Sequence, residues 1–232
     1  MQFIDICSKF IQTLLPQSCL LCGVGTGRHP LCAGCNADLP RSTSACCPVC
    51  ALPSPQSETC GTCLQHPPAF DATVAAFSYA FPADALLRAF KYREQLQIAI
   101  LVANNLVPAL TTRPRPDLVI PMPLHPQRLR QRGFNQAAEI AVRIGCALDI
   151  PLATNAVIRV RHTDPQAGLP LDKRKRNIRG AFAATQDLSG KKVAIVDDVM
   201  TSGASLDELA KTIKAAGAAS VECWIAARTP KD

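Results

Sequence analysis

Two adjacent carboxylates, Asp197 and Asp198, come directly after a short apolar run at residues 193–196. The small and β-branched side chains of that run suit a strand that is buried on both faces of a parallel sheet. Ionised carboxylates only accept hydrogen bonds, so the pair suits sugar hydroxyls or a hydrated Mg²⁺ ion. In open α/β sheets the ligand lies beyond the carboxyl ends of the strands. We therefore expect the strand to stop at the acidic pair and the pair to face a ligand.

A loop of small residues follows the acidic pair and leads into an amphipathic helix expected at residues 205–216. Backbone N–H groups at a helix N-terminus, together with the helix dipole, form a binding site for a phosphate group. Glycine adopts backbone angles that other residues avoid, and small neighbours let a phosphate approach closely. The alternative without a ligand is a polar turn that caps the helix. We expect a monophosphate to be bound by Thr201, Ser202, Gly203, Ala204 and Ser205.

Eight of the 12 cysteines form a duplicated pattern of Cys-x₂-Cys pairs. In each copy nine residues separate the two pairs, and the second copy repeats the first at a shift of 28 residues. Two such pairs present four thiolates to one tetrahedral Zn²⁺. In a reducing compartment, this many cysteines indicates metal binding rather than disulfides. We expect two structural zinc ions, bound by Cys19, Cys22, Cys32, Cys35, Cys47, Cys50, Cys60 and Cys63.

The spacing leaves open how the four cysteine pairs combine. Pairs that are neighbours along the chain would give two successive ribbons, whereas the first with the third and the second with the fourth would give a cross-brace. The clean repeat favours successive ribbons. Cys46 is expected to take no part in either site. Cys7, Cys146 and Cys223 stand in apolar surroundings and are predicted to be buried as small hydrophobic residues.

The size and composition of the chain fit one α/β domain with a small additional module. The chain has 232 residues, of which 48% are hydrophobic and only 5% aromatic, and its net charge of +7 makes a polyanion a candidate ligand. No apolar run reaches the length of about 18 residues that a membrane span needs, and residues 1–15 lack the features of a signal peptide. We expect a cytoplasmic protein, with peripheral attachment at the inner face of the membrane as the alternative.

Three regions are expected along the chain: an N-terminal amphipathic helix at 1–18, a double zinc ribbon at 19–66 and the α/β domain at 67–232. In the last region, strands are predicted at 72–80, 117–120, 156–160, 193–196 and 220–227, with helices at 83–92, 96–110 and 205–216. The prolines at 121–126 predict a stiff loop rather than a helix cap, followed by one helix that runs to about residue 148. Lys91, Tyr92 and Arg93 are interpreted as a solvated helix end, with contact to an anion as the alternative.

A basic segment lies between Arg159 and Arg179, where seven lysines and arginines stand against two aspartates. Such a run forms either a solvated helix face or a surface that binds an anion. We prefer the second interpretation and take Arg161, Arg174 and Arg176 as candidate contacts for an anionic ligand or for DNA.

Two blocks of the sequence resemble known families. The stretch from the apolar strand through the acidic pair to the Thr-Ser-Gly-Ala-Ser loop resembles the phosphoribosyl-pyrophosphate (PRPP) signature of type I phosphoribosyltransferases. Residues 121–136, Pro-Met-Pro-Leu-His-Pro-Gln-Arg-Leu-Arg-Gln-Arg-Gly-Phe-Asn-Gln, resemble the hallmark of the ComF family (ComFC and GntX), as does the segment that begins Arg-His-Thr at 161–163.

This resemblance implies a type I phosphoribosyltransferase-like parallel sheet flanked by helices, preceded by a small Cys₄ zinc-ribbon module. It implies binding of PRPP with Mg²⁺, a catalytic role for Asp197 and Asp198, and a pyrophosphate loop at Pro123, Leu124 and His125. His125 as a loop-capping residue is an equal alternative. It further implies a part in competence and the use of external DNA, alongside other competence proteins.

Two functions follow as expectations. The first is transfer of the phosphoribosyl group from PRPP to a nitrogen nucleophile that the sequence does not identify. The second is a non-catalytic, single-stranded-DNA-binding competence factor on a phosphoribosyltransferase scaffold. The low aromatic content argues against a strong independent DNA groove, because aromatic side chains supply the stacking platforms for single strands.

Overall fold

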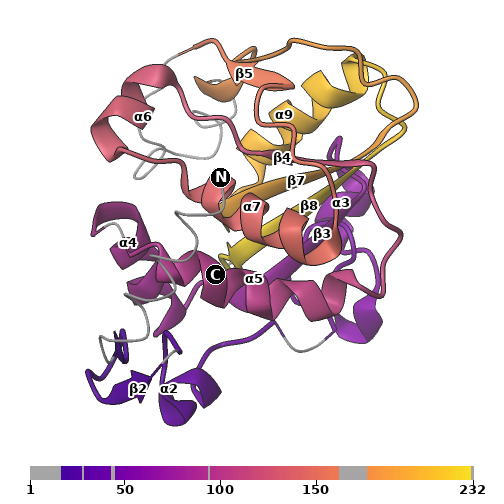
Figure 1. Ribbon diagram of the computed structural model, residues 1–232. Coiled ribbons are helices and arrows are strands. Elements are labelled where there is room, and N and C mark those ends of the chain that lie inside the picture. Colours follow the sequence, from indigo (N-terminus) through magenta and orange to yellow (C-terminus); the bar gives the residue numbers. More distant parts are fainter. Residues whose placement is uncertain (1–16, 28, 43–44, 94, 162–176, 231–232) are drawn as a thin grey trace.

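The centre of the molecule is a four-stranded parallel sheet with the strand order β3-β8-β7-β4 (Figure 1). The computed structural model describes residues 17–27, 29–42, 45–93, 95–161 and 177–230. The strands of the sheet are β3 (Ala72–Ser78), β4 (Leu118–Pro121), β7 (Lys192–Met200) and β8 (Ser220–Arg228). The predicted parallel sheet is thus confirmed, and the strand with the acidic pair is one of its two inner strands.

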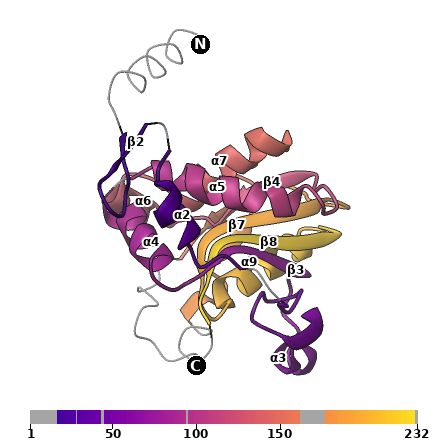
Figure 2. The ribbon, with the colours of Figure 1, turned by 90° about the horizontal axis from the view of Figure 1, so that it is seen from below.

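Helices cover both faces of this sheet (Figure 2). One face carries α4 (Ala83–Tyr92), α5 (Gln97–Leu110) and α7 (Gln136–Leu148), and the other carries α9 (Ala204–Ala215). Successive side chains of a strand point to opposite faces. Accordingly Ala194 and Val196 pack in the core with α5 and α7, whereas Val193 and Ile195 pack in the core with α9.

The cysteine-rich region forms two small ribbons that lie far apart in both views (Figures 1 and 2). The first ribbon, residues 17–42, contains β1 (Gln17–Ser18), β2 (Gly25–Gly27) and α2 (Ala33–Ala37). The second ribbon, residues 45–66, contains η1 (Pro55–Ser57) and α3 (Gly61–Gln65). The first joins the hydrophobic core on the α4–α5 face, and the second joins the core on the α9 face.

The end of the first ribbon runs along the outer edge of β3. The backbone N–H of Ser42 donates to the carbonyl of Ala76 at 3.0 Å, and the N–H of Ser78 donates to the carbonyl of Pro40 at 2.8 Å. On its other side β3 pairs with β8 in parallel register. Part of the free edge of the sheet is therefore covered by the chain that leads from the first ribbon to the second.

Two strands differ from the prediction. β7 does not stop at Val196 but continues through the acidic pair to Met200, still paired with β8. Residues 156–160 do contain a strand, β5 (Val157–Arg159), but it pairs antiparallel with β6 (Phe182–Ala184) outside the main sheet. The prediction that the acidic residues end the strand was wrong because β8 keeps supplying backbone partners beyond them.

The segment after β4 contains two helices instead of the single helix predicted. Pro126 begins α6 (Pro126–Arg132), and Gly133, with φ of 76°, ends it. Proline suits the first position of a helix because its missing N–H would have no intrahelical acceptor there. α7 then begins after Asn135, whose side-chain oxygen accepts from the backbone N–H of Ala137 at 3.0 Å. A loop does connect β4 to α6 at residues 122–125, as predicted, but its last residue caps α6, so the expectation that this stretch forms no helix cap was wrong.

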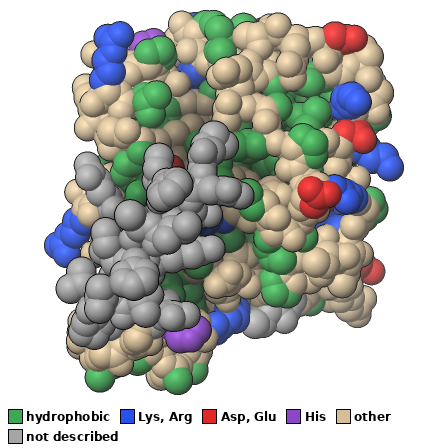
Figure 3. Space-filling model, in the orientation of Figure 1, with side chains coloured by type: hydrophobic (Ala, Val, Ile, Leu, Met, Phe, Trp, Pro, Cys, Tyr) green, Lys and Arg blue, Asp and Glu red, His purple; other side chains and the backbone are tan. Residues whose placement is uncertain are grey.

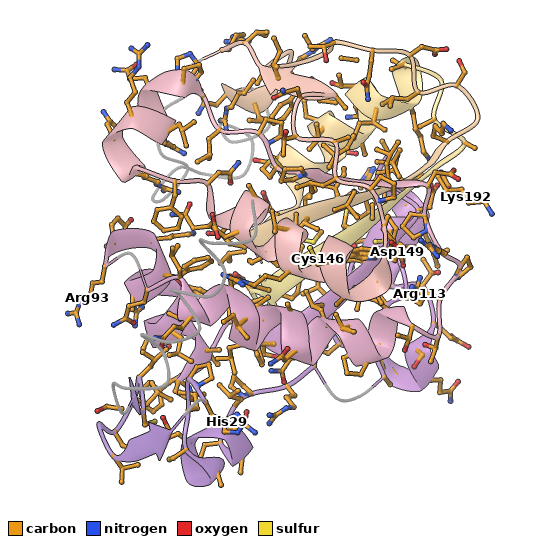
Figure 4. The ribbon with its side chains drawn as sticks, in the orientation of Figure 1. His29, Arg93, Arg113, Cys146, Asp149 and Lys192 are labelled. Carbon is orange, nitrogen blue, oxygen red and sulfur yellow. The ribbon has the colours of Figure 1, made fainter. Side chains whose placement is uncertain are left out.

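The cysteines outside the two ribbons divide between core and surface. Cys223 is fully buried, as predicted. Cys146 is exposed, against the prediction, and lies on the outer side of α7 (Figure 4). Cys7 lies outside the described residues. None of the helices in the described ranges is long and apolar enough to cross a membrane.

Candidate functional site

Asp198 on β7 forms an ion pair with Lys91 in the last turn of α4, with 2.8 Å between Nζ and the carboxylate. Only 24% of the lysine side chain and 14% of the aspartate side chain are exposed. Burial alone would lower the pKa of Lys91, but attraction to Asp198 outweighs it, and the pKa rises. The interpretation as a solvated helix end was therefore wrong for Lys91. It holds for Tyr92 and Arg93, which are exposed, and Arg93 points away from the molecule (Figure 4).

Asp197 has a different environment from its neighbour. Burial, and then the negative charge of Asp198, raise the pKa of Asp197 to about 7. Its carboxylate accepts from the backbone N–H of Asp198 at 2.8 Å. Asp197, together with residues 199–206, lines a small hollow at the start of α9. The two carboxylates therefore have separate roles, since one faces this hollow and the other holds a lysine.

The predicted phosphate loop lies in this hollow, at the junction of β7 and α9. Gly203 is the N-cap of α9 and has φ of 80°, a conformation that favours glycine. A Cβ at this position would lie 2.8 Å from Cε of Met200, so the end of that side chain would have to shift to admit any other residue. The side chain of Ser202 accepts from the N–H of Ala204 at 3.4 Å. The structure thus places the five predicted loop residues and Asp197 around one space.

A group of arginines acts electrostatically on Asp197 and its surroundings, and the sequence analysis named none of them as contacts. Arg128 is on α6, and Arg159 is on β5, with its Cζ 5.6 Å from the ring centroid of Phe182. Burial, and then the charge of Arg128, lower the pKa of Arg159, while Asp197 acts in the opposite direction. Burial, and then the charge of Arg132, lower the pKa of Arg128. The charges of these guanidinium groups therefore act on one another and on Asp197, an arrangement suited to an anion.

The signal for two of these arginines was in the sequence. Arg128 and Arg132 are four residues apart, a spacing that places two side chains on the same face of a helix. Figure 3 shows basic side chains at the upper left, over α6. Arg159 was counted in the basic segment predicted to bind an anion but was not named as a contact, because only the pairing of β5 with β6 brings it to the site.

The predicted pyrophosphate loop, Pro123 to His125, connects β4 to α6. Nδ1 of His125 accepts from the backbone N–H of Gln127 at 3.3 Å, so this histidine caps α6, as one of the two alternatives held. Nδ2 of Asn135 donates to the carbonyl of Met122 at 3.0 Å and so fixes the start of the loop to the start of α7. The pyrophosphate role of Pro123, Leu124 and His125 stays a prediction.

The eight ribbon cysteines form two separate groups, each of four thiols that lie within 4.8 Å of one another. The groups are Cys19, Cys22, Cys32 and Cys35, and Cys47, Cys50, Cys60 and Cys63. The prediction of successive ribbons is therefore confirmed over a cross-brace. Cys46 belongs to neither group, and its sulfur lies 3.8 Å from the hydroxyl oxygen of Ser42.

The geometry of both groups fits a tetrahedral zinc ion. The sulfur atoms of Cys22 and Cys32 are 3.7 Å apart, as are those of Cys50 and Cys60. Four thiolates at the usual Zn–S distance would be about 3.8 Å apart. Although burial opposes it, backbone N–H groups lower the pKa of Cys19 to about 6 and that of Cys47 to about 7. Each group thus contains one thiol that ionises near neutral pH, which favours binding of a structural zinc ion.

The basic segment is only partly described. Arg161 is exposed, and its Nη1 donates to the backbone carbonyl of Arg179 at 2.6 Å. This contact joins the two ends of the segment. Arg174 and Arg176 lie outside the described residues, so their anion-binding role stays a prediction.

Two protein-family models match separate parts of the chain. The double zinc ribbon domain matches residues 10–64, and the phosphoribosyl transferase domain matches residues 129–232. Competence protein F of Haemophilus influenzae is 32% identical over 87% of this chain and 91% of its own length. DNA utilization protein YhgH of Shigella flexneri is 33% identical over 93% of this chain and 98% of its own length. Competence protein ComFC of Bacillus subtilis is 25% identical over 86% and 84%, respectively.

Among solved structures, a glutamine PRPP amidotransferase from B. subtilis overlaps with 53% of this chain and 26% of its own. The TM-score is 0.36 and the sequence identity is 22%. The fold assignment therefore rests on the family domains and on the observed order of the parallel strands.

Proposed function

The chain belongs to the ComF family, that of competence protein F and YhgH, and on this premise we propose that it binds PRPP and transfers its phosphoribosyl group. The observation that carries the proposal is the hollow at the end of β7, where Asp197 and the loop 201–205 meet. The first turn of α9 offers N–H groups and the positive end of its dipole to the 5′-phosphate. The carboxylate of Asp197 then lies at the place for the ribose hydroxyls.

Charges around the hollow suit the rest of the substrate. The group of Arg128, Arg132 and Arg159, together with Lys91, provides positive charge for the pyrophosphate. Such fixed charges stabilise a leaving group as its negative charge develops. The ion pair with Asp198 holds Lys91 in position. Carboxylate oxygens are suitable ligands for a hydrated Mg²⁺, which, when bound, adds positive charge at the pyrophosphate.

The proposed reaction is a displacement at C1 of the ribose. A bond forms between C1 and a nitrogen of the acceptor, the bond from C1 to the pyrophosphate oxygen breaks, and pyrophosphate leaves with the electron pair. The acceptor nitrogen then loses its proton to solvent. Because pyrophosphate is a good leaving group, the proposal requires no general base from the chain.

The test is calorimetric titration with PRPP and Mg²⁺, combined with pyrophosphate release across a panel of bases and amines. We expect Asp197→Asn to weaken PRPP binding by about tenfold or more, since a hydrogen bond to a charged group contributes roughly 1.5–3 kcal/mol. Asp187→Asn, an exposed carboxylate in a turn, is the matched control and should bind like the parent. Equal affinity of Asp197→Asn and the parent would remove the main support for the PRPP site.

The DNA-related part of the proposal comes from the names of the relatives, which concern competence and DNA utilization. We extend that role to this chain, on the cytoplasmic side of the membrane and with single-stranded DNA as a partner. Changing Arg174 and Arg176 to alanine should then flatten the salt dependence of DNA binding by about one unit of slope per lost phosphate contact. An unchanged slope would show that the segment is only a solvated surface.

A further inference from the structure

Arg228 is the last residue of β8 and is almost completely buried, with 5% of its surface exposed. In the sheet it stands beside Met200, the last residue of β7, where the phosphate loop begins. A buried guanidinium is unfavourable unless its donors find acceptors and its charge is offset. The groups around this arginine must therefore supply hydrogen-bond acceptors and negative charge.

The side chain of Arg228 connects two regions that are distant in sequence. Its Nε donates to the carbonyl oxygen of Cys50, a member of the second four-cysteine group, at 2.8 Å. Its Nη1 donates to the carbonyl of Met200 at 2.8 Å and also to the carbonyl of Thr201, the first residue of the phosphate loop. A further contact at 3.0 Å goes to the carbonyl of Thr229. One guanidinium thus holds both a cysteine turn and the start of the loop.

The positive charge of Arg228 is complementary to the negative charge that the second four-cysteine group carries when its thiols are ionised. Burial lowers the pKa of Arg228, whereas the sulfur groups of Cys50, Cys63 and Cys60 act to raise it. Four thiolates around one Zn²⁺ carry a net charge of −2. A buried cation beside them offsets this charge, in the way that groups behind the direct ligands tune metal sites.

Two more contacts join the segment just after the second ribbon to the same loop and helix. The Phe70 ring packs in one core with Cys47 and Cys50, and lies 3.9 Å from where a Cβ of Gly203 would stand. The backbone N–H of Ala69 donates to the carboxylate of Asp207, in the first turn of α9, at 2.7 Å. The segment after the second ribbon therefore contacts both the core around the second cysteine site and the phosphate loop with α9.

We propose that Arg228 is a positioning residue that couples the second four-cysteine site to the phosphate loop. With metal bound, the cysteine turn and the guanidinium fix the carbonyls of Met200 and Thr201, and thereby the direction of the loop N–H groups. Loss of the metal releases the arginine and weakens phosphate binding. By thermodynamic linkage, PRPP must raise the zinc affinity of this site by the same factor. The inference rests on the proposed PRPP site and adds control of that site by metal.

The experiment measures zinc affinity of the full-length protein by competition with a chelator, with and without saturating PRPP and Mg²⁺. A Cys22→Ser background, in which the first site is disabled, assigns the zinc to the second site. We expect PRPP to raise the zinc affinity of the second site by about fivefold or more, a typical size for coupling between sites. Arg228→Gln should remove this increase and weaken PRPP binding by a similar factor.

Arg41→Gln is the matched control, because Arg41 ties the first ribbon, and not the second, to the α/β domain. It should leave the coupling unchanged. Should Arg228→Gln fail to fold, Arg228→Lys keeps the charge but lacks the planar fork, and a normal melting curve with lost coupling would support the proposal equally. If PRPP binds the parent but does not change its zinc affinity, the coupling is overturned.

Failure of the proposed function gives a different result. If the zinc-loaded parent binds no PRPP, the proposed PRPP site is wrong, and the zinc affinities alone then decide the role of Arg228. A lower zinc affinity at the second site in Arg228→Gln, with the first site unchanged, would support the link to the cysteines. Equal zinc affinity in Arg228→Gln and the parent would overturn it.

Discussion

The two four-cysteine sites share one spacing but have different surroundings. Cys22 of the first site and Cys50 of the second occupy equivalent positions in the repeat, yet Cys22 is exposed and Cys50 is only 7% exposed. In the second site Cys47 and Cys63 are also buried, and all three pack in the core that contains α9. In the first site only Cys19 is buried, in the core that contains α5, so the same ligand pattern lies partly at the surface in one place and mostly within the core in the other.

The way each site is attached shows the same contrast. In the first ribbon Nε of Arg41 donates to the side chain of Asn105 on α5 at 3.0 Å, a partly buried contact at the helix surface. For the second ribbon the corresponding link is the buried Arg228 of β8, whose Nε donates to the carbonyl of Cys50. In the second ribbon, too, the hydroxyl of Thr73 on β3 donates to the carbonyl of Val49 at 2.6 Å. The two ribbons thus differ in the residues that contact their metal ligands. The spacing of the cysteines does not reveal these contacts.

The largest expected effect compares Cys50→Ser with Cys22→Ser. Loss of metal from the second site opens a buried core worth several kcal/mol, so we expect Tm to fall by roughly 10 °C. PRPP binding should weaken by about fivefold or more, the size expected for the coupling between the two sites. Loss of metal from the first site should unfold that ribbon locally and lower Tm by less than about 3 °C. Zinc content, melting curves and PRPP titration check this, and similar losses in both variants would contradict the contrast.

An intermediate effect is expected at the glycines near each site. Gly203→Ala forces a side chain into a left-handed conformation beside Met200, which should lower the free energy of unfolding by about 1–2 kcal/mol and weaken PRPP binding. Gly34→Ala in the first ribbon has open space and no such conformation, so it should not lower stability. Chemical denaturation measures both variants. A destabilised Gly34→Ala with a normal Gly203→Ala would reverse the comparison.

The smallest effect concerns pH and extends the comparison to the two carboxylates. Burial, and then the charge of Asp198, raise the pKa of Asp197 to about 7, so near neutral pH the folded chain keeps a proton that the unfolded chain releases. Its contribution to stability is present at low pH and is lost as pH rises through about 7. PRPP affinity should change in the opposite sense and increase from pH 6 to pH 8, since the ribose hydroxyls require the ionised carboxylate.

Calorimetric titrations at several pH values test this expectation. Asp197→Asn should lack the pH dependence, whereas a variant that retains both carboxylates, such as Asp187→Asn, should keep it. A parent protein whose PRPP affinity does not change between pH 6 and pH 8 would show that Asp197 does not titrate in this range.

Features encoded by short spacings were predictable from the sequence. The two cysteine groups, the loop from Thr201 to Ser205 and the buried strand before them all depend on residues that are close along the chain. The positions of Lys91 and Arg159 beside the acidic pair depend on packing between separate elements, which no local pattern specifies. The continuation of β7 past Val196 has the same origin, because β8 supplies its partners.

The exposure of Cys146 was predictable in principle. α7 buries Ile140 and Ile144, which are four residues apart and share one helix face. Cys146 follows Ile144 by two residues and so points away from that face. The apolar neighbours of the cysteine suggested burial, but helical periodicity was the better guide.

The first ribbon's end covers part of an edge strand of the sheet, which bears on how that edge meets other chains. An uncovered edge strand presents unpaired N–H and C=O groups and is a template for pairing with other chains. Here Pro40 and Ser42 occupy part of that edge by hydrogen bonds to Ser78 and Ala76. Removing residues 1–42 would therefore expose unpaired backbone groups along this part of β3, and we expect the shortened chain to associate more readily than the full chain.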